Sequence, residues 1–189
     1  MSNRNDSRDR MIKATALLLQ TKGYVGTGLN DIVKESEAPK GSIYHHFPGG
    51  KEQLAIEAVN WTKENVTLFI KERLALYADP SEAIKQFVIN SADRFEGDSY
   101  LTGVPITALI LETSSSSEEL RNACQAVFEA WIEVFATKLL LNGYQEEKAY
   151  SLGMTINVMI QGAFVTSLAR KDAEALRAIA NVIPLLLKE

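Results

Sequence analysis

The sequence has few of the residues on which metal centres and catalytic sites usually depend. It contains one cysteine, Cys124, and two histidines, the neighbours His45 and His46. One cysteine cannot form an internal disulfide, and it supplies no thiolate cluster for zinc or iron–sulfur. Adjacent histidines on a helix point about 100° apart, and no third or fourth ligand accompanies them. We therefore expect no metal and no cofactor, and we expect Cys124, in an apolar helical segment, to be a buried bystander.

The same scarcity makes an enzyme the least favoured class of function. With both histidines in one short segment, none is left for a nucleophile–base pair elsewhere. The glycine-rich stretch GYVGTG follows a helical pattern instead of a strand, and PGGKE lacks the Ser or Thr of a phosphate-binding loop. Acidic pairs such as Glu118/Glu119 and Glu146/Glu147 stand at expected helix starts, where the helix dipole explains them.

Long hydrophobic runs are also missing. No stretch approaches the ~18 uninterrupted apolar residues that span a bilayer, and the charged start MSNRNDSRDR does not have the form of a signal peptide. Yet 46% of the 189 residues are hydrophobic, which is enough to build a core. We expect a globular, cytoplasmic protein that does not associate with membranes.

The charge is unevenly distributed along the chain. The formal net charge is −4, which by itself argues against a nucleic-acid partner. Residues 1–50, however, hold seven Lys and Arg against five Asp and Glu, whereas residues 51–189 hold thirteen against nineteen. The average therefore hides a basic N-terminal part.

Strand-type alternation is nearly absent, whereas apolar residues recur with i, i+3, i+4 spacing throughout. The pattern predicts an all-α protein, with helices over residues 6–22, 28–36, 40–46, 51–77, 81–95, 117–141, 146–170 and 172–188 and a short helix after Pro105. Local signals support several ends: Gly23 as a left-handed cap, Asp79 and Asp172 as N-caps, and Ser116 with Glu119 as a capping box. Helix 51–77 exceeds the span of a three-helix domain. We therefore expect an N-terminal domain at 5–65 and a C-terminal helical bundle at 66–189.

The stretch PKGSIYHHFPGGK, residues 39–51, has an unusual composition for an acidic protein. Its helix has little apolar surface, with Ile43 and Phe47 as the anchors. Three short helices, the last two separated by a turn of about four residues, form a helix-turn-helix unit, with a DNA-reading motif at about 29–48 whose last helix enters the major groove. The side chains available to phosphates and base edges are Lys40, Ser42, Tyr44 and His45, with Gly41 allowing close approach and Lys51 at the next helix start. The alternative for Tyr44 is a half-buried packing ring.

Residues 12–54 resemble the DNA-binding domain of the TetR family of bacterial repressors. The matching positions are Gly23, Tyr24, Thr27, Ile32, Lys40, Gly41, Tyr44, His46, Phe47, Lys51 and Leu54. The resemblance implies a helix-turn-helix DNA-binding domain followed by a helical ligand-binding and dimerisation domain, and it adds Thr27 and Gly28 to the DNA contacts. Two positions depart from the family pattern. Glu37 replaces a turn glycine, so either Glu37 adopts a left-handed conformation or the turn differs slightly, and Pro39 replaces a capping serine. The APKGS segment and the loop near Gly103 and Pro105 resemble the subgroup of lincomycin- and flavonoid-responsive regulators.

Aromatic residues of the C-terminal part are mostly core, but a subset can line an effector cavity. Asn157 and Gln161 stand four residues apart on an otherwise apolar helix, and buried amides need partners that a ligand can supply. We expect an aromatic or hydrophobic effector to contact Trp61, Phe128, Trp131, Asn157 and Gln161. The alternative is that the amides bond to neighbouring helices or lie at a subunit interface.

The last two helices are apolar on more than one side, which indicates a partner. The expected interface residues are Val158, Gly162, Val165, Ala169, Leu176, Ile179 and Ile183, and the family resemblance implies a homodimer that reads a pseudo-palindromic double-stranded DNA site.

The sequence thus favours a ligand-responsive dimeric DNA-binding transcriptional regulator, a repressor released from its operator by a small effector. A helical small-molecule carrier without a DNA role is the alternative from another class. An activator is also consistent with the sequence, because the sign of regulation depends on where the operator lies.

Overall fold

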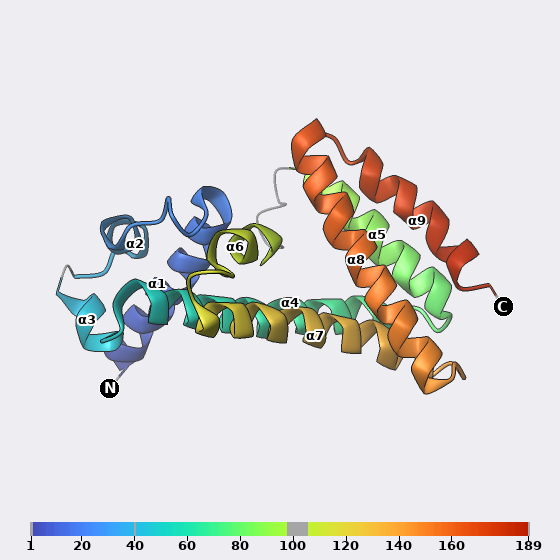
Figure 1. The fold of residues 1–189 in the computed structure, drawn as a ribbon, viewed down its shortest axis with the longest axis horizontal. Coiled ribbons are helices and arrows are strands. Elements are labelled where there is room, and N and C mark those ends of the chain that lie inside the picture. Colours follow the sequence, from blue (N-terminus) through green and yellow to red (C-terminus); the bar gives the residue numbers. More distant parts are fainter. Residues whose placement is uncertain (1, 40, 98–105, 189) are drawn as a thin grey trace. The chain divides into compact units, whose positions relative to one another are not determined.

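The computed structural model of the chain describes residues 2–39, 41–97 and 106–188. Every regular element in these ranges is an α-helix, which confirms the predicted fold class (Figure 1). The helices form two compact units: the first joins Met1–Glu64 to Ile106–Val127, and the second joins Asn65–Pro105 to Phe128–Glu189. The sequence division at residues 65 and 66 assigns 106–127 to the C-terminal domain, so the two divisions differ over that segment.

The first unit is built around the N-terminal helices. Its elements are α1 (Ser2–Lys22), α2 (Leu29–Ser36), α3 (Ser42–His46), the first part of α4 (Gly50–Ala75), α6 (Ile106–Thr113) and the first part of α7 (Glu118–Leu140). The fully buried side chains at its centre, each no more than 2% exposed, include Met11, Ile32, Ile43, Phe47 and Leu54. Ile43 and Phe47 therefore anchor α3 as predicted, and they leave its other residues free of the core.

Two turns of this unit use left-handed backbone. Gly23 ends α1 with φ +71°, and Glu37 ends α2 with φ +52°. The predicted cap at Gly23 is confirmed, and of the two alternatives for Glu37 the left-handed conformation is the one observed. Glu37 adopts this conformation without being a glycine, and two hydrogen bonds close the helix end: the Glu37 N–H donates to the Lys34 carbonyl and the Ala38 N–H to the Val33 carbonyl.

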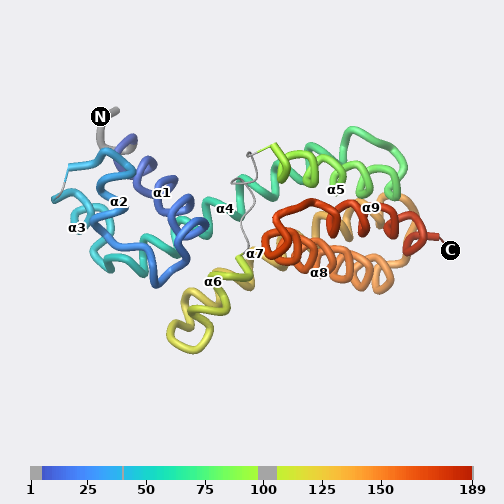
Figure 2. Tube along the Cα trace, turned by 90° about the horizontal axis from the view of Figure 1, so that it is seen from above, coloured from blue at the N-terminus to red at the C-terminus, as the bar shows by residue number. Residues whose placement is uncertain are grey.

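The second unit packs α5 (Pro80–Glu96), α8 (Glu146–Arg170) and α9 (Glu174–Leu186) with the later parts of α4 and α7. Figure 2 shows α9 lying beside both α5 and α8. Asp79 caps α5 as predicted, because its carboxylate accepts a 2.7 Å hydrogen bond from the Glu82 N–H. The buried core of this unit includes Ile84, Val88, Phe135, Leu139, Ile156, Leu176 and Ile183.

Two details correct the sequence interpretation. The cap of α7 is Ser117, whose hydroxyl accepts from the Leu120 N–H at 3.1 Å, and not Ser116, whose hydroxyl donates to the Thr113 carbonyl. Leu176 and Ile183 are fully buried inside the second unit, so they belong to its core and not to a dimer surface. They face inward because α9 presents its most apolar stripe to its own neighbours, α5 and α8.

Cys124 lies on α7 and is fully buried, as expected. Burial in apolar surroundings raises the pKa of its thiol to about 11, because the thiolate would lose its hydration. The thiol is therefore protonated at neutral pH, consistent with a packing residue.

Candidate nucleic-acid interface

The short helix α3 has one buried side and one exposed side. Ile43 is 2% exposed, whereas the next residue, Tyr44, is 64% exposed and His45 is also exposed. Gly41 precedes the helix in the open, with no atom within 4 Å of the position that a Cβ would occupy. A polar outer side above an apolar anchor is the arrangement expected of a helix that approaches a groove. Lys40, the first of the predicted DNA contacts on this helix, lies outside the described residues.

The exposed ring of Tyr44 lies next to the start of α4. Gly50 has φ +65°, and the position that a Cβ would take there is 3.8 Å from Tyr44 Cε1. One residue later, the Lys51 ammonium stands 4.3 Å above the centroid of the Tyr24 ring. Burial, followed by the charge of Glu52, raises the pKa of Tyr24, so that this phenol stays neutral. The neutral aromatic ring of Tyr24 holds the Lys51 ammonium group in place. The N–H donors of this ammonium group stay available for a phosphate.

Two of the predicted DNA contacts, Thr27 and Ser42, have structural roles within the unit. Thr27 is 1% exposed, and its hydroxyl donates to the Gly23 carbonyl at 2.7 Å. It stabilises the α1–α2 turn, and its side chain does not reach the surface. The Ser42 hydroxyl donates to the Pro39 carbonyl at 2.6 Å, so it braces the start of α3.

Gly28 takes part in a junction between α1 and α2. Its N–H donates to Asp31 Oδ2 at 3.1 Å, while Asp31 Oδ1 accepts from Lys22 Nζ at 3.2 Å. The hydrogen bond from Lys22, followed by that from the Gly28 backbone, lowers the pKa of the Asp31 carboxyl. The carboxylate therefore fixes the first turn of α2 to the last turn of α1.

The sequence interpretation missed two residues at this surface. Val25, in the turn between α1 and α2, is 80% exposed, which is unusual for a large apolar side chain. Its backbone N–H donates to Glu112 Oε2 at 2.8 Å, across 87 residues of sequence. The sequence could have indicated Val25, because an apolar residue inside a glycine-rich turn is unusual. No residue near Glu112 in the sequence indicates that its side chain contacts this turn.

The predicted effector residues are distributed over both units. Trp61, half-buried on α4, belongs to the first unit, whereas the other four belong to the second. On α7 the Phe128 and Trp131 rings meet edge to face, with centroids 6.2 Å apart. On α8 the side chain of Asn157 is buried, with 4% exposure, as expected for an amide on an apolar helix. The side chain of Gln161 is only half-buried.

Trp131 has an unmatched donor. Its side chain is 4% exposed, and its Nε1–H has no acceptor among the described residues. Buried indole N–H groups normally find a partner, because an unmade hydrogen bond costs about 1–3 kcal/mol. A small molecule that carries an acceptor would supply it.

An apolar stripe follows the outer side of α8. Its exposed members recur at spacings of three, four and seven residues, with exposed fractions of 38–62%: Tyr150, Met154, Val158, Val165 and Leu168. Gly162 and Ala169, also predicted interface residues, are exposed on the same helix, and on α9 Ile179 is half-buried. The large apolar side chains that α9 exposes are Val182 and Leu185.

By length and hydropathy α8 also meets the minimum for a membrane span, with a mean hydropathy of 1.4 over its most apolar window. Length and composition alone are weak support for a span, because helices of soluble proteins pass the same test. The exposed apolar residues form one stripe, and Asn157 is buried on another side. This is the pattern of a helix that packs against protein on two sides.

The sequence matches two protein-family descriptions. Residues 11–58 match the bacterial regulatory proteins of the tetR family, and residues 80–182 match the LmrA/YxaF-like C-terminal domain of transcriptional regulators. Among related proteins, the HTH-type transcriptional regulator YxaF of Bacillus subtilis is 46% identical over 189 residues, covering 100% of this chain and 99% of its own. The HTH-type transcriptional regulator LmrA of the same organism is 44% identical, covering 97% of each.

Solved structures agree on the fold. A TetR transcriptional regulator from Chloroflexus aurantiacus superposes with a TM-score of 0.82 at 26% identity, covering 97% of this chain and 94% of that one. Reduced Escherichia coli NemR gives a TM-score of 0.83 at 21% identity, covering 94% and 95%, and this likeness concerns the fold alone. With identities of 44–46% over nearly full length, and with both halves matched to the same family, the chain belongs to the TetR family of helix-turn-helix transcriptional regulators, in the group with an LmrA/YxaF-like C-terminal domain.

Proposed function

We propose that this transcriptional regulator is a cytoplasmic homodimeric repressor that a small aromatic or hydrophobic effector releases from a pseudo-palindromic operator. The observation that carries the proposal is the outer side of α3, where Tyr44 is 64% exposed although its neighbours Ile43 and Phe47 are buried. A large ring held in solvent by a well-anchored helix is suited to a phosphate contact. Tyr44, His45, Gly41 and Lys51 are the proposed DNA contacts within the described residues, and Lys40 stays among the predictions.

The proposed dimer uses the apolar stripe of α8 together with Val182 and Leu185 of α9. Exposed apolar stripes of this kind mark interaction surfaces, and members of this family act as dimers. A two-fold axis would place two α3 helices about 34–36 Å apart, one turn of the duplex.

For the effector, the unmatched Trp131 N–H supports a site on the α7–α8 side of the second unit. Phe128 would offer a ring edge and Asn157 a buried amide, so the preferred molecule is an aromatic compound that carries a hydrogen-bond acceptor. Release requires that the effector favour a form with wrongly spaced reading helices, and each tenfold loss of operator affinity requires about 1.4 kcal/mol of coupling.

DNA binding is tested by fluorescence anisotropy with duplexes from the upstream region of the protein's own gene. Tyr44→Phe removes one hydroxyl donor, and we expect affinity to fall about fivefold, corresponding to about 1 kcal/mol. Tyr77→Phe is the matched control at the end of α4. Lys51→Gln should reduce the slope of log K against log salt by about 1. Salt-independent binding, or no binding to any upstream duplex, would contradict the proposal.

Effector action is tested with chromone, a neutral two-ring aromatic ketone. We expect chromone to release the parent protein from DNA. Trp131→Phe, which keeps a ring and removes the N–H, should raise the required concentration about tenfold. If the variant responded like the parent, the role of the Trp131 N–H would be wrong, whereas the DNA-binding proposal would stand on its own measurement.

A further inference from the structure

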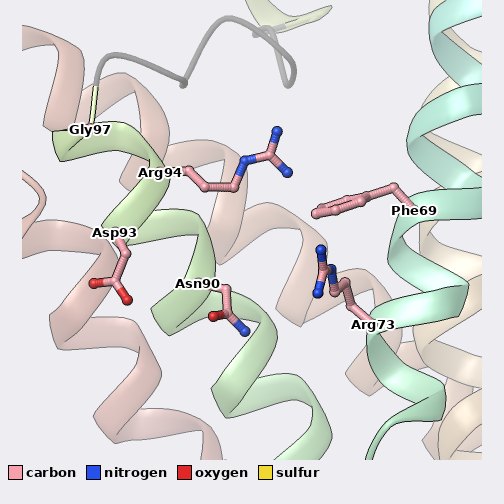
Figure 3. A pocket seen from close by; sticks show the side chains of 6 residues that line it. All are labelled: Phe69, Arg73, Asn90, Asp93, Arg94 and Gly97. Carbon is pink, nitrogen blue, oxygen red and sulfur yellow. The ribbon is translucent and has the colours of Figure 1, made fainter.

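A surface pocket in the second unit combines positive charge with an aromatic ring. It has a volume of about 350 Å³ and lies between α4 and α5, lined by Phe69, Arg73, Asn90, Asp93, Arg94 and Gly97 (Figure 3). None of these residues belongs to the predicted effector set. The volume is at the lower end for small-molecule sites, so it suits a compound of one or two rings.

Two guanidinium groups share one ring in this pocket. The Arg94 carbon Cζ stands 4.7 Å from the Phe69 centroid, and the Arg73 Cζ stands 5.0 Å from it. Figure 3 shows the two side chains reaching the ring from different helices, Arg94 from α5 and Arg73 from α4. Two like charges at one ring repel each other, and the π face compensates only part of that cost. An anion placed between them would be attracted by both.

The acidic residue of the pocket is already engaged. Asp93 Oδ1 accepts a 2.9 Å hydrogen bond from Arg177 Nη2, which also donates to Glu96 Oε2 at 2.7 Å. In Figure 3 the Asp93 carboxylate points away from Phe69 and from the two pocket arginines. No carboxylate among the described residues forms an ion pair with Arg73, whose guanidinium contacts the Phe69 ring. Asp93 therefore does not neutralise the charge of Arg73 in the pocket.

The remaining lining suits the other parts of an organic anion. Asn90 lines the same pocket with an amide that can donate or accept a hydrogen bond. Phe69 also packs toward the interior, with its centroid 6.3 Å from that of Phe87, which in turn lies 5.9 Å from Phe135. The ring that would contact a ligand is thus held rigidly by the core of the unit.

We propose that this pocket binds a planar aromatic carboxylate, with Arg73 and Arg94 as donors to the carboxylate and Phe69 beside the ligand ring. Guanidinium groups match carboxylates in shape and charge, and charge-assisted hydrogen bonds of this type are stronger than neutral ones. This site is separate from the Trp131 region, and its existence does not depend on how the chain controls transcription.

The test is isothermal titration calorimetry of the full-length protein with 2-naphthoate. We expect saturable binding, and about tenfold weaker binding for each of Arg73→Gln and Arg94→Gln. Lys71→Gln is the matched control, because it removes an exposed positive charge from the same helix outside the pocket, and it should leave the affinity unchanged.

Comparison of different ligands on the parent protein tests the proposal even if a variant folds poorly. On the parent protein, 2-naphthamide has the same rings without the charge and should bind at least tenfold more weakly than 2-naphthoate. Inorganic phosphate should not displace the naphthoate at equal concentration. Equal affinity for acid and amide, absence of naphthoate binding to the parent, or an unchanged affinity in both folded arginine variants would overturn the inference.

Discussion

The Glu112 carboxylate accepts a hydrogen bond of 2.8 Å from the backbone N–H of Val25, connecting the end of α6 to the turn between α1 and α2. The same carboxylate fills the space beside Gly23, where a Cβ would come within 2.2 Å of Glu112 Oε1. Gly23 therefore has two reasons to lack a side chain: its φ of +71° and this close approach. The turn that supports the proposed DNA surface is positioned by a residue from a distant part of the chain.

Removal of this acceptor should loosen the α1–α2 turn. In Glu112→Ala we expect the Val25 amide to exchange with solvent faster than in the parent, because the N–H loses its partner. Glu112→Gln keeps a carbonyl acceptor and should give an intermediate rate. Hydrogen exchange measured by NMR provides the comparison, and equal Val25 exchange in all three proteins would show that the bond does not persist in solution.

Gly153 and Gly162 both lie inside α8, but their surroundings differ. A Cβ on Gly153 would come within 2.8 Å of the Ile132 carbonyl oxygen of α7, whereas a Cβ on Gly162 would meet no atom within 4 Å. We expect Gly153→Ala to lower the free energy of unfolding by about 1–3 kcal/mol through overpacking. Gly162→Ala, the control, should raise it by about 0.5–1 kcal/mol. Urea denaturation measures both, and a Gly153→Ala protein as stable as the parent would refute the close α7–α8 contact.

The lowered pKa of Asp31 predicts an acid-dependent effect. A carboxyl whose folded pKa is below its unfolded value, 3.8 for the free side chain, contributes stability that is fully present above that unfolded value. The contribution is lost as the pH falls through the lowered folded pKa. Asp31→Asn should therefore melt at a lower temperature than the parent at pH 7, and the difference should shrink towards pH 3. Thermal unfolding followed by circular dichroism measures this, and a difference that grows on acidification would contradict the assignment.

The proposed dimer depends on the exposed α8 stripe, in which Val158 is 62% exposed. Val158→Arg would bury a charge at the interface, so we expect sedimentation velocity to show a monomer where the parent is dimeric. Thr137→Arg introduces the same charge at an exposed position of α7 and should stay dimeric. A dimeric Val158→Arg protein would place the interface elsewhere.

Much of the local structure follows from neighbouring residues. The left-handed turn at Gly23, the Asp79 cap and the anchors Ile43 and Phe47 were all predicted, because each depends on residues within a few positions of one another. The family resemblance was confirmed for the same reason, since the motifs of a helix-turn-helix unit are compact in sequence. Thr27 shows the limit of motif reasoning: its position was recognised, but its hydroxyl serves the turn.

The sequence by itself determined that the chain is helical, where most of its helices begin and end, and which family it belongs to. Hydrophobic periodicity, helix caps and family motifs each depend on residues that are close together in the sequence. Only the tertiary structure decided which apolar residues of α8 and α9 are core and which are exposed, since a helix that is apolar on several sides does not reveal which side meets its neighbours. Leu176 is buried in the core and Val158 is exposed, and the apolar pattern of the two helices did not distinguish them. The Glu112–Val25 bond and the shared contact of Arg73 and Arg94 with Phe69 likewise arise from long-range packing, which no local pattern encodes.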